Sequence, residues 1–302
     1  MAYYLSNRGY DVFVSNYRGN IYGRRHVNKT IADPKFWDFS IDEQVDFDLP
    51  AKIKLLQRVT GHEKIAYVSW SQGAMTMFAL QSDQPEYADV IELFIAMAPT
   101  VLINNLTSPL HRLLFKVAIP FPNTNAPLAP IGALGRYVFD KICPYTRIQR
   151  EQCTKGLFLF TGPDDEAFQQ ERMGTFLHHA PSGSSFKNYV QFAQNFYSVN
   201  KFIRYDFGPV KNLLRYGQLQ PPEYDLTRIR SKSIVIFAAD NDYMAGPKDV
   251  ANLIARLRPK LHRFVNMTEV RAKWNHIDFL HHVRSGVLIN PRIDSVLREF
   301  IN

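Results

Sequence analysis

Short apolar runs alternate with longer amphipathic segments near both ends of the chain. Each short run is rich in β-branched and aromatic residues and ends at a polar turn, which predicts a buried strand. The longer segments carry apolar side chains at helical spacing. The expected strands are 10–15, 64–70, 92–98, 233–238 and 263–270, and the expected helices are 41–59, 74–81, 248–257 and 294–301.

The alternation stops between Pro99 and about Pro222, where prolines and loops interrupt the helical stretches. Strands that alternate with helices predict a parallel sheet covered on both faces. We therefore expect an α/β core formed by 1–99 and 223–302, with 100–222 inserted as a cap or lid. An insertion at the carboxyl ends of parallel strands lies over the place where ligands bind.

The 302-residue chain has a formal net charge of +8. A basic balance suits nucleic acid or an acidic membrane surface. The basic residues are dispersed, however, apart from a cluster at Arg24, Arg25 and His26, and no nucleic-acid-binding motif is present. We expect a solvated basic surface and no nucleic-acid partner. No apolar run reaches the length of a transmembrane helix, and the first residues lack the features of a secretory signal.

The stretch around Ser71 is the most informative in the sequence. An apolar strand ends there, a helix begins, and the small residues Ser69 and Gly73 lie two positions on either side. This is the context of a nucleophile elbow, usually written G-x-S-x-G, in which a serine at a tight bend needs small neighbours. The helix N-terminus behind it favours a developing negative charge. A simple helix cap by Ser71 is the alternative that the motif alone leaves open.

Candidate partners for Ser71 follow two later strands, in the order serine, acid, histidine that is typical of α/β-hydrolases. Asp240 and Asp242 follow the strand expected at 233–238 and compete for the role of the acid, although either could be a turn residue. His276 follows the last expected strand and is the best-placed base. The pairs His178-His179 and His281-His282 fit less well.

The residues alone do not decide whether the two cysteines are bonded or whether the three glycosylation sequons are used. Cys143 and Cys153 form neither a CxxC motif nor a metal-binding cluster, and they can be two free buried thiols or a disulfide. The sequons at Asn28, Asn105 and Asn266 matter only if the chain enters the secretory pathway. We expect no metal and no cofactor.

Several uncommon motifs together resemble the acid lipase family of gastric and lysosomal lipases. The similarity runs through nearly the whole chain and includes the elbow, the acid motif and the histidine motif. The matching segments are Gly9–Val12, Arg18–Asn20, Phe36–Glu43, Asp48–Ala51, Ser71–Gly73, Ala98–Pro99, Pro181–Ser185, Pro221–Tyr224, Asp240–Ala245 and Asn275–Phe279.

The resemblance implies an α/β-hydrolase fold and a lipase that cleaves triacylglycerols or sterol esters at a lipid–water interface. Ser71 would be the nucleophile, His276 the base and Asp242, rather than Asp240, the acid. The backbone N–H of Gln72 would supply part of the oxyanion hole.

The family's cap and location carry further implications. Apolar segments of the cap such as Leu113–Pro122 would suit an acyl chain or a lipid surface, with ordinary cap core as the alternative. The family's cap disulfide favours a bond between Cys143 and Cys153. A secreted or lysosomal location, implied by the resemblance, favours use of the sequons.

The chain also departs from the family pattern. A family strand ending in His-Gly-Leu, which supplies the second oxyanion donor between the strands expected at 10–15 and 64–70, is absent from the sequence as given. We therefore expect an N-terminally incomplete core, and a catalytically inactive lipid- or partner-binding protein is the alternative function.

At the elbow, Ser69 replaces glycine and Trp70 replaces histidine, and we expect Trp70 to reshape the acyl pocket. The cysteine that the family often carries near Thr161 is missing.

Overall fold

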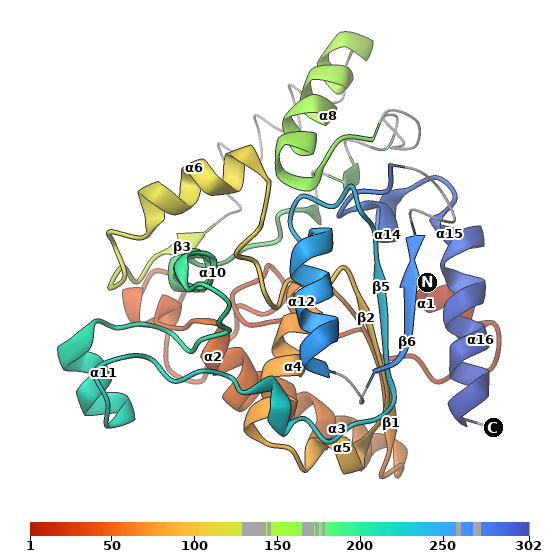
Figure 1. The fold of residues 1–302 in the computed structure, drawn as a ribbon, viewed down its shortest axis with the longest axis horizontal. Coiled ribbons are helices and arrows are strands. Elements are labelled where there is room, and N and C mark those ends of the chain that lie inside the picture. Colours follow the sequence, from red (N-terminus) through yellow and green to blue (C-terminus); the bar gives the residue numbers. More distant parts are fainter. Residues whose placement is uncertain are drawn as a thin grey trace.

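A parallel sheet with helices on both faces forms the centre of the molecule (Figure 1). The computed structural model describes residues 1–128, 143, 146–164, 172, 175–176, 179–257, 261–267 and 273–301. Its sheet has the order β1-β2-β5-β6, and every neighbouring pair of strands is parallel. The strands are β1 (Ile65–Trp70), β2 (Ile91–Met97), β5 (Ile234–Ala238) and β6 (Leu261–Asn266).

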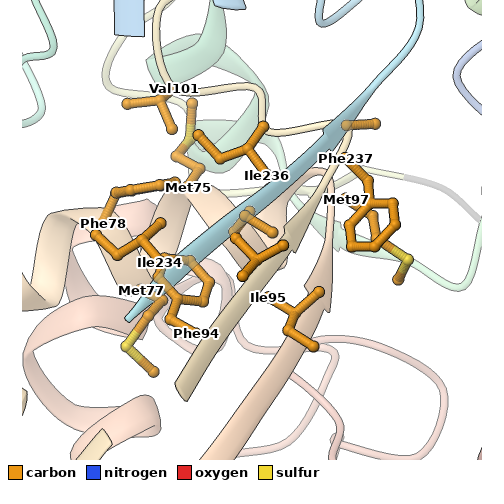
Figure 2. Packing of buried hydrophobic residues seen from close by; sticks show 14 of the residues in the cluster. Met75, Met77, Phe78, Phe94, Ile95, Met97, Val101, Ile234, Ile236 and Phe237 are labelled. Atoms are coloured by element: carbon orange, nitrogen blue, oxygen red, sulfur yellow. The ribbon is translucent and has the colours of Figure 1, made fainter. Parts of the chain in front are cut away.

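Helices pack on the sheet because its strands are apolar on both faces, as parallel strands usually are. Figure 1 shows α4 (Gln72–Asp83) and α12 (Pro247–Leu257) on one side of the sheet and α16 (Asn290–Ile301) on the other. Figure 2 shows the side chains of α4 against those of the two central strands. The strands β1, β2, β5 and β6 lie at or near four of the five expected positions, and helices follow β1, β5 and β6 along the chain.

The strand expected at 10–15 is wrong: the segment has no regular secondary structure and pairs with no described strand. Strand β1 forms the edge of the described sheet, and a segment without a ladder partner lacks the hydrogen bonds that stabilise a strand. Phe13 and Val14 are accordingly 46% and 78% exposed. The helix expected at 41–59 does form, but with a wider turn at Gln44–Asp48 between its two α-helical parts. The last positions of the strand expected at 263–270 lie outside the described residues.

The segment 100–222 contributes helices and one short two-stranded ladder in its described part. A disulfide joins Cys143 to Cys153 on α8, as the family resemblance implied. No helix in the described part of the chain is long and apolar enough to cross a membrane. The elements of this segment are α6 (Pro109–Ala118), β3 (Pro127–Leu128), α8 (Arg147–Thr161), β4 (Ser184–Ser185), α10 (Phe186–Tyr197) and α11 (Pro209–Tyr216).

The remaining elements are short or flank the core. They are α1 (Ala2–Ser6), η1 (Pro34–Trp37), α2 (Ile41–Glu43), η2 (Gln44–Asp48), α3 (Leu49–Thr60), α5 (Tyr87–Val90), η4 (Leu226–Arg228), α14 (Asp278–His281) and α15 (Ser285–Leu288).

The buried carboxylate of Asp42 joins the N-terminal part of the chain to the inserted segment. Its oxygens accept hydrogen bonds from Gln191 Nε2 (2.6 Å), the Tyr224 hydroxyl (2.8 Å) and the Tyr205 main-chain N–H (2.9 Å). Burial raises the pKa of Asp42, while nearby Arg204 and these donors oppose the rise. Because each donor is itself buried or part-buried, loss of the carboxylate leaves several polar groups unpaired.

We expect Asp42→Ala to lower the free energy of unfolding by about 3–5 kcal/mol, the usual cost of leaving a buried polar network incomplete. Urea unfolding followed by circular dichroism measures the loss. Asp33→Ala is the control, since it removes one helix-capping acceptor, for Lys35 N–H, and is expected to cost only about 1 kcal/mol. Equal losses in the two variants would show that the Asp42 network does not stabilise the fold.

Candidate active site

Ser71 lies at a strained bend between β1 and α4. Its φ of 55° and ψ of −120° are rare for a residue with a side chain. The bend is held because Ser71 N–H donates to the Met97 carbonyl at 2.9 Å, at the end of β2. A Cβ atom on Gly73 would come within 3.3 Å of the Ser69 Cβ atom, which explains why this turn needs small residues. The sequence thus predicted the strand–turn–helix geometry around Ser71 correctly.

His276 lies between Ser71 and Asp242 and is hydrogen-bonded to both. Its Nε2 is 2.7 Å from Ser71 Oγ, and its Nδ1 is 2.8 Å from Asp242 Oδ2. All three side chains are buried, and His276 and Asp242 are each only 1% exposed. A carboxylate only accepts hydrogen bonds, so Nδ1 carries the proton and Nε2 is free to accept from Ser71.

The loop after β5 distinguishes Asp242 from Asp240. Asp242 Oδ1 accepts the main-chain N–H groups of Met244 and Ala245, each at 2.8 Å, which fixes the carboxylate toward His276. Asp240 is exposed and accepts from Asn266 Nδ2 at 3.3 Å. Of the two acids that the sequence left in competition, only Asp242 contacts the histidine.

The carbonyl of Thr161, at the end of α8, binds the two loops that carry Asp242 and His276. It accepts from His276 N–H at 3.1 Å and from Tyr243 N–H at 3.3 Å. The adjoining Gly162 carbonyl accepts from Asn275 Nδ2 at 2.8 Å. The inserted segment therefore positions the acid and the histidine, a role that the sequence did not reveal because it uses main-chain atoms.

Several lipases are similar in sequence to this chain over almost its whole length. It is 32% identical to the gastric triacylglycerol lipase of Bos taurus, over 99% of this chain and 74% of that protein. It is 34% identical to the gastric triacylglycerol lipase of Rattus norvegicus, over 93% of this chain and 70% of that protein. Lipase member K of Homo sapiens is 31% identical, over 92% and 69% respectively. The chain belongs to the acid lipase family.

Other comparisons are weaker. No family model matches the chain. A solved structure, the monoacylglycerol lipase of Paleococcus ferrophilus, aligns with a TM-score of 0.48 and 12% identity over 86% of this chain and 76% of that one. The described sheet is parallel and has helices on both faces, which is the architecture expected of an α/β-hydrolase.

The N–H group of Gln72 lies in the first turn of α4, beside Ser71. This N–H donates no hydrogen bond to any described residue. The Gln72 side chain is fixed separately, since its Nε2 donates to Gln44 Oε1 at 2.6 Å. An uncommitted N–H at a helix N-terminus can bind a developing negative charge.

None of the described alternatives among the histidines that the sequence offered is hydrogen-bonded to Ser71. His282 is buried and stacks on Trp274, with ring centroids 5.0 Å apart, and its Nδ1 accepts from Arg284 N–H. His281 packs edge-on against Phe176. His179 is exposed, and His178 lies outside the described residues.

A further buried histidine, His111 on α6, was missed by the sequence reasoning. Burial lowers its pKa to about 3, and nearby His276 adds to the effect. Its Nδ1 is 2.9 Å from Ser108 Oγ, which also donates to the Leu159 carbonyl at 2.9 Å. His111 is therefore a neutral residue of the interior, packed against Phe160 and Phe115.

The three sequons differ in their surroundings. Asn28 is exposed. Asn105 is also exposed, but its side-chain amide donates to Asp249 Oδ1 at 2.7 Å. Asn266 donates to Asp240, and the threonine of its sequon lies outside the described residues. No group of three side chains suited to a metal ion occurs among the residues that the structure describes.

Asp278 supports the turn that carries His276 and generates a prediction about pH. Its Oδ2 accepts Asn275 N–H at 2.6 Å, and burial, reinforced by the Asp164 and Asp242 carboxyls, raises its pKa to about 8. The folded protein therefore keeps a proton that the unfolded chain releases near its ordinary pKa of 3.8. The retained proton therefore stabilises the folded protein fully below pH 3.8, and this stabilisation is lost as the pH rises toward about 8.

We expect Asp278→Asn to gain stability relative to the unchanged protein as the pH is raised, because the amide keeps an acceptor for Asn275 N–H but cannot ionise. Urea unfolding at about pH 5 and pH 8 gives the comparison. A stability difference that stays constant between the two pH values would contradict the assignment.

Proposed function

We propose that this chain is a serine lipase, which hydrolyses carboxylic esters of neutral lipids, triacylglycerols or sterol esters, through an acyl-enzyme. The observation that carries the proposal is the buried hydrogen-bonded series Ser71–His276–Asp242 at the carboxyl edge of the sheet. Ligands of parallel α/β sheets bind at this edge. The names of the relatives, gastric triacylglycerol lipase among them, agree with this substrate class.

The reaction follows from the protonation states in the site. Ser71 Oγ attacks the ester carbonyl carbon while its proton passes to His276 Nε2. His276 returns that proton to the alcohol oxygen as the carbon–oxygen bond breaks, which leaves the acyl group on Ser71. A water molecule, deprotonated by His276, then releases the fatty acid and restores Ser71. Asp242 holds the imidazole in the required tautomer throughout and stabilises its charged form.

Two further groups have parts in this proposal. The N–H of Gln72 would donate to the negatively charged oxygen of the tetrahedral intermediate, where one such donor is typically worth about 3–4 kcal/mol. The segment 100–222 would be the cap over the site, with 1–99 and 223–302 as the core. A secreted or lysosomal location fits the family, and the sequons at Asn28, Asn105 and Asn266 would then be candidates for glycosylation. Asn28 is exposed, whereas the side-chain amides of Asn105 and Asn266 donate to Asp249 and Asp240.

The second candidate is an inactive lipase-like protein that binds lipid or a partner through its cap. The exposed apolar side chains of α6 and α11 favour it, because they could bind lipid or a partner without any reaction. The geometry favours an enzyme, because an inactive protein has no need to keep Ser71 strained and bonded to His276. A direct assay separates the two candidates.

We expect the protein to hydrolyse a short-chain nitrophenyl ester and Ser71 to react with a fluorophosphonate probe. Ser71→Ala should abolish both signals, and Asp242→Asn should lower kcat by about 10⁴-fold because the imidazole then adopts the wrong tautomer. Asp240→Asn is the matched control and should retain activity, since Asp240 is exposed and does not contact His276. Equal rates for the protein and for Ser71→Ala would favour the binding protein instead.

We further propose that α6 and α11 contact the lipid surface. Exposed apolar side chains lie on α6, its following turn and α11, and Figure 1 shows both helices on the side of the molecule away from β6 and α16. Lys211 of α11 donates to Asn123, just beyond α6, at 2.6 Å, which links the two helices. The residues and their exposed fractions are Leu113 (59%), Leu114 (36%), Val117 (59%), Phe121 (56%), Val210 (74%), Leu213 (51%) and Leu214 (84%).

The orientation of α11 is the specific argument for a lipid contact. Its one buried residue is the polar Asn212, whereas Val210, Leu213 and Leu214 face outward. Asn212 Nδ2 donates to Asp206 Oδ1 at 2.7 Å and thereby holds the helix with its apolar face exposed. Together with the exposed Lys211, this face resembles an interfacial helix, which combines apolar and basic residues.

We expect the double change Leu213→Asp with Leu214→Asp to lower activity on emulsified triacylglycerol by about tenfold or more, because two leucines can no longer enter the interface. Activity on a soluble short-chain ester should stay unchanged. The control is Leu55→Asp with Val59→Asp on α3, where the side chains are 47% and 64% exposed. If both double variants lose emulsion activity equally, α11 is not the lipid-binding helix.

A further inference from the structure

Trp70, for which the sequence predicted an effect on the acyl pocket, contacts the proposed catalytic histidine. Its indole Nε1 donates to the main-chain carbonyl of His276 at 2.8 Å. The centroids of the two rings are 4.9 Å apart, with the planes inclined by 38°. The indole therefore makes two contacts with His276, one with its backbone and one with its imidazole ring.

The two main-chain polar groups of His276 are both fixed, and from different parts of the fold. The N–H donates to the Thr161 carbonyl of the inserted segment at 3.1 Å, whereas the C=O accepts from Trp70 at the end of β1. Fixing both peptide units that flank the Cα atom restricts rotation of the backbone about it. The ring of Trp70 also restricts the imidazole, which is hydrogen-bonded to Ser71 and Asp242.

We propose that Trp70 is a positioning residue that sets the distance between the base and the nucleophile, an inference that rests on the function proposed above. Trp70 and Ser71 are consecutive residues. The nucleophile and the side chain that binds the backbone of His276 therefore both lie at the end of β1. The register of β1 with β2 holds that end, with Trp70 opposite Met97 and the Ser71 N–H bonded to the Met97 carbonyl. Movement of β1 therefore carries Ser71 and the anchor of His276 together.

The hydrogen bond and the ring contact can be separated by substitution. Trp70→Phe keeps an aromatic ring but removes the N–H donor, and Trp70→Leu removes both. A histidine that is held less firmly destabilises the transition state more than it weakens substrate binding. The substitution is therefore expected to lower kcat and not to raise KM. We expect kcat on a short-chain nitrophenyl ester to fall about tenfold in Trp70→Phe and further in Trp70→Leu, with KM unchanged.

Trp274→Phe is the matched control. Trp274 lies two residues before His276, yet its ring stacks on His282 and its indole N–H is buried without a hydrogen-bond partner among the described residues. The same substitution there removes a donor that binds nothing, and we expect kcat to be unchanged. Thermal unfolding of each variant shows whether the fold is intact.

A double-mutant cycle with His276→Ala separates positioning from other roles. If Trp70 acts through His276, then Trp70→Phe lowers kcat in the unchanged protein but adds no loss once His276 is gone. An equal loss in both backgrounds, an unchanged kcat in Trp70→Phe, or a changed preference for acyl-chain length with kcat preserved would each overturn the proposal. An unchanged protein that neither hydrolyses the ester nor reacts with a fluorophosphonate would instead overturn the proposed function.

Discussion

The carbonyl oxygen of Thr161 is the point on which the geometry of the site depends. It binds the N–H groups of Tyr243 and His276, which belong to loops after different strands. The acid and the histidine thus share one anchor, while Ser71 is anchored separately by the sheet. A carbonyl oxygen has two acceptor positions, and here both are occupied. A shift of α8 would displace Asp242 and His276 together, which preserves their mutual bond but changes the distance to Ser71.

The inserted segment is consequently part of the scaffold of the site as well as a candidate cover for it. Gly162 follows Thr161 with a φ of 105°, and a side chain there would collide with the carbonyl of Asn241. Thr107 N–H donates to the Tyr243 carbonyl at 3.0 Å, so the start of α6 also binds the acid loop. On the opposite side, the Asp42 network fixes α10 and α11 to the N-terminal helices. These contacts are polar and directional, so they specify one arrangement of the insertion over the core.

The sequence predicted those features that depend on local patterns. The apolar runs revealed β1, β2, β5 and β6, and the small residues around Ser71 revealed the bend, because both are constrained by neighbours along the chain. The strand expected at 10–15 failed because pairing depends on a partner far away in sequence. The roles of Thr161 and Trp70 could not be predicted either, since they act across about a hundred residues or more and one of them uses only a main-chain carbonyl.

Ser69 and Trp70, the two residues before Ser71, have different surroundings. Ser69 is buried in the sheet, where its hydroxyl lies 3.4 Å from the Ile95 carbonyl and its Cβ atom still leaves room for Gly73. Among the described residues, the Ser69 hydroxyl thus has its hydrogen-bond partner in the sheet and not in the site. Trp70, in contrast, extends from the sheet to the backbone of His276. Among the described residues, the main chain of His276 is bonded to the inserted segment at Thr161 and to Trp70. The indole thus adds a hydrogen bond from the part of the fold that carries Ser71 itself.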